Sequence, residues 1–222
     1  MSAPAQVALP RYGFGDELAS SVIHGIGILL SIVGLAALVV RTASHGTLSD
    51  LLASAVYGVS LMALYTASTL YHSIRTESAR RVLRTLDHIA IFLLIAGTYT
   101  PFTLIALRGT WGWSLFGIIW SLALLGTALE LGLLKRYRRF AVLLYVAMGW
   151  VGIIAFRPLL AHLQTGGMLL LLAGGVAYTL GVPFYLWRKL PYHHSVWHFF
   201  VLAGSVLQFL AVFFYVVPYA PV

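Results

Sequence analysis

The chain has 222 residues, of which 60% are hydrophobic and only 9% are charged, and its formal net charge is +8. A soluble domain carries about 25% charged residues, so this composition excludes a soluble protein and indicates one that lies in lipid. The absence of cysteine excludes disulfides and thiolate metal sites. The basic residues stand in short clusters between apolar runs, which is typical of a membrane protein and not of one that binds nucleic acid.

Apolar runs long enough to cross a membrane follow one another along the whole chain. A membrane-spanning helix needs about 20 apolar residues, and turn residues or basic residues separate the runs here. The sequence therefore predicts an all-α fold, a seven-transmembrane helix bundle that forms a single domain over residues 1–222. The predicted spans are residues 18–40, 51–72, 87–107, 112–134, 139–157, 167–188 and 195–217.

The distribution of Lys and Arg predicts the orientation. The N-terminal segment and the loops after the second, fourth and sixth spans hold 1, 4, 4 and 2 of these residues, 11 in total, whereas the other loops and the C-terminus hold 3. Basic loops remain on the cytoplasmic side of a membrane. We therefore predict a cytoplasmic N-terminus and a C-terminus outside, with anionic membrane lipids as partners of the basic loops.

Polar and ionisable side chains gather at the predicted cytoplasmic ends of four spans. Such residues are costly inside a membrane and are usually functional. Ser68 and His72 lie four residues apart at the end of the second span, so they share a helix face. Asp87 begins the third span, and His194 and His198 form another i, i+4 pair at the start of the seventh. The first span contributes Glu17, Ser20, Ser21 and His24.

An i, i+4 histidine pair can offer two nitrogens to one metal ion, and a histidine from another helix would complete three ligands. Zinc with three protein ligands and an open position carries a water whose pKa falls to about 7. Asp87 is the candidate to orient that water or to act as general base, with Ser68 beside it. Both could equally act through hydrogen bonds to the ligands. Histidine pairs at this spacing also arise by chance, so the spacing alone leaves metal binding open.

The other ionisable residues of the spans and loops have simpler interpretations. His45 and His162 fall in loops on the outer side, and His193 lies off the face of the histidine pair. His88 follows Asp87 directly and is expected to point to a different side. Glu130, late in the fourth span, is expected to snorkel to the interface or to pair with a basic residue.

Five segments stand out along the chain. They are ELASSVIHG from residue 17, ASTLYHS from residue 67, LDHIAIF from residue 86, GTYTPF from residue 97 and HSVWHFFVLAGS from residue 194. Together they span nearly the whole chain, and in this order they resemble the bacterial hemolysin III branch of the progestin and adipoQ receptor (PAQR) family. Ser20 stands where that family often has Asn, and Gln208 where it often has His.

The resemblance implies a seven-helix protein of the bacterial cytoplasmic (inner) membrane with a cytoplasmic N-terminus. It also implies a Zn²⁺ ion held by His72, His194 and His198, with Asp87 and Ser68 in water-linked or supporting roles.

Three functions are then open. The first is a zinc-dependent hydrolase of a lipid amide, because related receptors are linked to ceramidase-type activity. The second is a non-enzymatic sensor or regulator of membrane lipid homeostasis with a structural zinc. The third, a pore-forming cytolysin, fits least well, since the chain is apolar and oriented by charge like a resident membrane protein. The sequence leaves the substrate, the oligomeric state and the roles of Glu17, His24 and Glu130 open.

Overall fold

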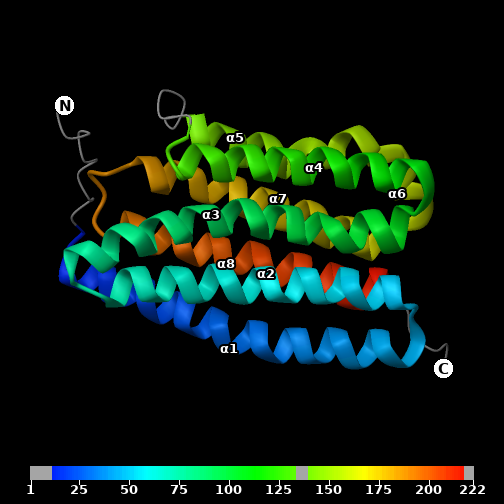
Figure 1. Ribbon diagram of the computed structural model, residues 1–222, viewed down its shortest axis with the longest axis horizontal. Coiled ribbons are helices and arrows are strands. Elements are labelled where there is room, and N and C mark those ends of the chain that lie inside the picture. The colour runs from blue at the N-terminus through cyan, green and yellow to red at the C-terminus, as the bar shows by residue number, and fades with distance from the viewer. Residues whose placement is uncertain (1–11, 134–139, 218–222) are drawn as a thin grey trace.

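The computed structural model describes residues 12–133 and 140–217 (Figure 1). Within these residues the regular structure is helical, and seven helical segments are long and apolar enough to cross a membrane. The predicted all-α, seven-span fold is therefore confirmed. The helices are α1 (Phe14–His45), α2 (Leu48–Ser73), α3 (Glu77–Pro101), α4 (Gly109–Glu130), α5 (Ala141–Trp150), α6 (Phe156–His162), α7 (Thr165–Leu186) and α8 (His193–Ala211). The π-helical stretches Phe102–Leu107 and Val212–Val216 continue α3 and α8, and the 3₁₀ stretch Val151–Ala155 joins α5 to α6.

The fifth span is not one continuous α-helix and is longer than the predicted span of residues 139–157. In the structure it extends over Ala141–His162, as α5, the 3₁₀ stretch and α6 in succession. The Tyr99 hydroxyl, from α3, donates to the Gly149 carbonyl at 2.9 Å and accepts from the Gly152 N–H at 2.8 Å. A tyrosine from a neighbouring helix thus pairs backbone groups at the break, which a span inside lipid requires.

Two spans are longer than their apolar parts. The first extends over Phe14–His45 instead of 18–40, and the third begins at Glu77 instead of residue 87. Arg80 and Arg81 lie in the additional turns of α3, and both form ion pairs with glutamates. Hydropathy detects only the part of a helix that lies in hydrocarbon, so it misses such polar turns. The predicted basic loop of residues 135–139 lies outside the described residues, as do the adjoining ends of the fourth and fifth predicted spans.

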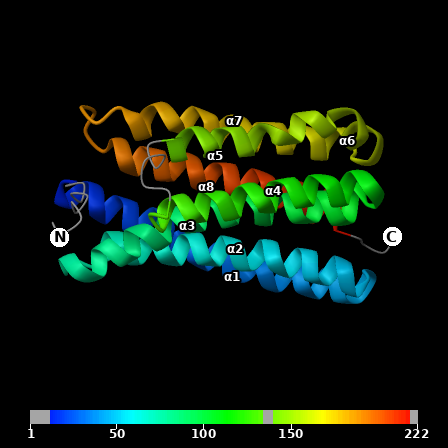
Figure 2. The same cartoon turned by 45° about the horizontal axis from the view of Figure 1, so that its top comes forward.

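The helices run side by side along one long axis, so α1 begins and α8 ends at opposite ends of the bundle (Figure 1). α8 packs mainly against α7 and α1, and α2 packs between α1 and α3 (Figure 2). Gly27 permits the close approach of α1 to α2, because a Cβ there would be 2.4 Å from the Tyr65 ring. One turn earlier on α1, His24 meets the same ring edge-on at 5.0 Å between ring centroids.

We predict that the end of α8 faces the outside of the cell. An odd number of spans places the two termini on opposite sides, and the basic loops favour a cytoplasmic N-terminus. An alkaline phosphatase fused at the C-terminus should be active, and green fluorescent protein fused there should be dark. Fusions truncated after Ser73 should show the reverse pattern. Fluorescence from the C-terminal fusion would contradict the orientation.

Candidate metal centre

Three histidines meet at the end of the bundle where α2 ends and α8 begins. His72 comes from the last turn of α2, and His194 and His198 come from the first two turns of α8. All three are buried, and each offers one ring nitrogen within 4.8 Å of the others. The Nε2 atoms of His72 and His198 are 3.0 Å apart. The structure therefore brings together the three residues that the sequence proposed as ligands.

The start of α8 sets the depth of the histidine pair. Tyr192, in the left-handed conformation (φ 56°), precedes the first turn. Asp16 of α1 then accepts a hydrogen bond from the Ser195 N–H at 2.9 Å and another from the Ser195 hydroxyl. A carboxylate at a helix N-terminus pairs a free N–H group and favours the helix dipole. Asp16 thereby fixes α8 against α1 at the level of the site.

The outward nitrogens of two of the rings are held by α1. His72 Nδ1 lies 2.6 Å from Glu17 Oε2, and His198 Nδ1 lies 2.8 Å from His24 Nε2. Histidines that bind metals usually engage their second nitrogen in this way, which fixes the tautomer and the ring orientation. Arg80 of α3 forms an ion pair with the same Glu17 carboxylate. The Nε2 atoms of His72 and His198 remain to face one another.

This donor set fits a zinc ion. Two imidazole nitrogens bound to one tetrahedral zinc at about 2.0–2.1 Å lie about 3.3 Å from each other, and the corresponding atoms of His72 and His198 are 3.0 Å apart. His194 Nδ1 is buried without a hydrogen-bond partner among the described residues. A buried polar atom without a hydrogen-bond partner is costly unless a bound group pairs with it. Neutral imidazole is also a preferred zinc ligand.

Asp87 and Ser68 lie next to this group and outside it. Asp87 is buried and interacts electrostatically with His72 and His88, but its carboxylate does not belong to the group of mutually close ligand atoms. Ser68 precedes His72 by one turn and neighbours Asp87. Its buried hydroxyl is without a hydrogen-bond partner among residues 12–133 and 140–217. Both side chains are therefore buried neighbours of the histidine group without belonging to it.

Glu17 and His24 are the residues whose roles the sequence left open. They are seven residues apart on α1, so they share a helix face, and that face points at His72 and His198. This spacing is a signal in the sequence from which their part in the site could have been predicted.

Tyr12 is a further residue of the site, and no pattern in the sequence indicates it. Its ring stacks on His194 with 4.3 Å between centroids. Burial raises the pKa of the Tyr12 phenol, so it remains a neutral cover over the histidines.

Four other histidines offer no nitrogen to this group of mutually close ligand atoms, namely His45, His88, His162 and His193. His88 Nδ1 lies 3.4 Å from Glu130, which is only 4% exposed and therefore does not snorkel. His193 Nδ1 is 3.1 Å from the Phe184 carbonyl oxygen. His45 and His162 are exposed at helix ends, where each ring lies beside the carbonyl four residues earlier.

A family model described as "Haemolysin-III related" matches residues 12–209, which include every residue of the centre. The chain belongs to this family. It is 48% identical to Hemolysin-3 of Bacillus cereus over 205 residues, which are 92% of this chain and 94% of the relative. It is 46% identical to the Hemolysin-3 homolog of Bacillus subtilis (strain 168) over 202 residues, covering 91% and 95% of the two chains.

The human Monocyte to macrophage differentiation factor is a more distant relative. It is 28% identical over 171 residues, which are 72% of this chain and 68% of the human protein. The seven spans and the bacterial relatives together make this haemolysin-III-related chain an integral membrane protein of the bacterial membrane.

We predict that the double variant His194→Ala/His198→Ala purifies without bound zinc, because His72 alone cannot hold the ion. Elemental analysis of the detergent-solubilised protein should show one zinc per wild-type chain. The matched control, His45→Ala/His162→Ala, should keep its zinc, because both of its histidines are exposed and distant from the centre. Equal zinc in wild type and the double variant would refute the site.

We also predict that Glu17→Gln weakens zinc binding by about 10- to 100-fold, the usual effect of losing an outer hydrogen-bond partner of a ligand. Titration with chelators of graded affinity would measure this change. Glu77→Gln is the matched control, because Glu77 pairs with Arg81 at the exposed start of α3. An unchanged affinity in Glu17→Gln would show that the Glu17–His72 contact does not tune the metal.

Proposed function

We propose that this protein is a zinc-dependent hydrolase that cleaves a membrane lipid amide whose acyl chain lies inside the helix bundle. The observation that carries the proposal is a cavity that starts at the histidines and continues between α3, α5, α7 and α8. His194, His198 and Asp87 line one end of it. A purely structural metal is normally enclosed by its ligands, whereas a catalytic one needs access for substrate and water.

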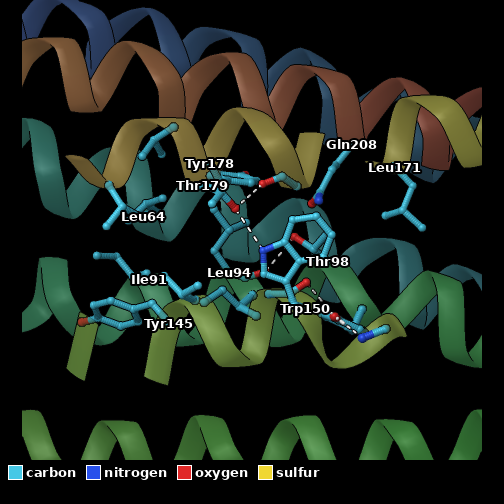
Figure 3. A pocket seen from close by; sticks show the side chains of 18 of the residues that line it. Leu64, Ile91, Leu94, Thr98, Tyr145, Trp150, Leu171, Tyr178, Thr179 and Gln208 are labelled. Atoms are coloured by element: carbon cyan, nitrogen blue, oxygen red, sulfur yellow. Dashed lines mark hydrogen bonds between the residues drawn. The ribbon is translucent and has the colours of Figure 1, made fainter. Parts of the chain in front are cut away.

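The cavity has the shape and lining that a lipid chain requires. Asp87, Ile91, Leu94 and Thr98 recur every three or four residues along α3, so one face of this helix forms a wall, which continues to Phe102. Fifteen residues of helix separate Asp87 from Phe102, or about 22 Å. A single lipid chain occupies about half of the hydrocarbon core, roughly 15 Å. Most of the remaining wall is apolar, and Figure 3 shows its middle part.

Each residue of the centre has a role in such a hydrolysis. When bound, zinc polarises a carbonyl group and lowers the pKa of a water to about 7. In the proposed reaction, Asp87 takes a proton from the water and passes it to the amine that leaves. Water thus adds its hydroxyl to the acyl carbon and a proton to the nitrogen as the C–N bond breaks. The Ser68 hydroxyl can hydrogen-bond to Asp87 or the water, and Glu17 and His24 hold the ligand rings in place.

We predict that Asp87→Asn retains zinc and lowers the turnover of a lipid amide by at least about 100-fold, the usual range for loss of a general base. The assay is the release of fatty acid from a panel of labelled ceramides by the purified protein. Zinc content, measured on the same samples, is the control for an intact site. Undiminished turnover in the variant would remove Asp87 from the mechanism.

A non-enzymatic regulator with a structural zinc is the second candidate. It is favoured by the contacts of the ligands with α1, because Glu17–His72 and His24–His198 make the centre a junction of α1, α2 and α8. In that case no lipid amide would be turned over, and chelation would lower the melting temperature sharply. If chelation abolished the turnover of a lipid amide and added zinc restored it, this candidate would be excluded.

A further inference from the structure

Polar side chains gather in the middle of the cavity, far from the histidines. Thr98, Trp150, Tyr178, Thr179 and Gln208 all line it there (Figure 3). Uncompensated polar groups are costly at this depth of a membrane protein. The question is therefore which of them find partners within the bundle.

Four of these five side chains form internal hydrogen bonds. The Trp150 Nε1–H donates to the Thr179 hydroxyl at 3.0 Å, and this hydroxyl donates to the Gly175 carbonyl at 2.8 Å. The Tyr178 hydroxyl lies 2.7 Å from the Ser205 hydroxyl. Thr98 donates to the carbonyl one turn earlier on α3. These four side chains use their hydrogen-bonding groups within the bundle, so few donors or acceptors remain for a ligand.

Gln208 differs from the others. Its carboxamide has two N–H donors and an oxygen acceptor, yet no hydrogen bond joins it to any described part of the chain. Its direction is set by Gly174 of α7, because a Cβ at Gly174 would lie 2.5 Å from Gln208 Cγ. The absence of a side chain at Gly174 thus gives the Gln208 stem the space through which it reaches the cavity.

The position of Gln208 indicates what it would contact. It lies ten residues after His198 on the same helix, about 15 Å along the axis. That distance is about half the hydrocarbon thickness, the depth of the far part of a chain whose head lies at the histidines. A plain hydrocarbon would leave the carboxamide unpaired. A hydroxyl group would both accept from its N–H and donate to its oxygen.

We propose that Gln208 is a second recognition point in the cavity, which selects lipid chains that carry a hydroxyl group in their far half. The inference rests on the proposed function for the placement of the head group, and it specifies the substrate class of the same cavity. An ordinary saturated chain binds without this contact and therefore more weakly.

The test compares stearic acid with its monohydroxylated derivatives, in which the hydroxyl stands at successive positions along the chain. Dissociation constants for the zinc-loaded, full-length protein in detergent are measured by displacement of a fluorescent fatty acid. One hydrogen bond to an otherwise unpaired group should make a far-half derivative bind roughly 2- to 10-fold more tightly than stearic acid. Derivatives hydroxylated near the carboxylate should show no such gain.

Gln208→Met should abolish the preference for far-half hydroxyl groups, because methionine keeps the length of the side chain without its amide. Gln208→Leu provides a second variant if the first fails to fold. Gln164→Met is the matched control, because Gln164 is exposed before the first turn of α7. Equal binding of all derivatives, or a preference that survives in both Gln208 variants, would overturn the proposal.

These measurements are independent of catalysis. A preference for hydroxylated chains that depends on Gln208, in a protein that hydrolyses no lipid amide, would support the recognition point and refute the hydrolase. Hydrolysis of ceramides without any preference for a far-half hydroxyl, in binding or in turnover, would support the hydrolase and refute the recognition point.

Discussion

The contact between Glu17 and His72 is the interaction on which the rest of the centre depends. One carboxylate of α1 engages an imidazole of α2 and the Arg80 guanidinium of α3. Each of these groups would be costly alone at the edge of the hydrocarbon, and removing one partner leaves the others uncompensated. Pairing therefore draws the ends of three helices together. The same contact turns His72 Nε2 toward His198, so one interaction both joins helices and orients a candidate ligand.

Asp16, which precedes Glu17 on α1, fixes the position of α8 in a similar way. Its carboxylate binds the first turn of that helix through Ser195, and His24, two turns further along α1, supports His198. The first turns of α1 thus position both helices that supply the three clustered histidines, although none of the three belongs to α1. Helix association in lipid relies on packing and hydrogen bonds because the hydrophobic effect between helices is absent. A dense set of polar contacts at one end is well suited to define how these helices meet.

How far the sequence predicts this structure depends on whether a signal lies within one helix. Apolar runs and the spacing of His194 and His198 are local, so the spans and the histidine pair could be predicted. The break in the fifth span could not, because its backbone groups are satisfied by Tyr99 of α3. The burial of Glu130 against His88 also depends on another helix. Tyr12 covers His194 from a segment whose composition indicates nothing of the kind.

The cavity bears most directly on whether the centre performs chemistry. Helices in a membrane associate through close packing, so a cavity between them forfeits the contacts that hold a bundle together. α5 and α7 contact one another far less than α7 and α8 do, and the cavity lies between α3 and this weakly joined pair. A lipid chain in that space would restore the missing contacts. A bundle that only enclosed a metal would gain stability by closing around it. The apolar cavity that reaches Asp87 and the histidines therefore favours a site that admits a substrate.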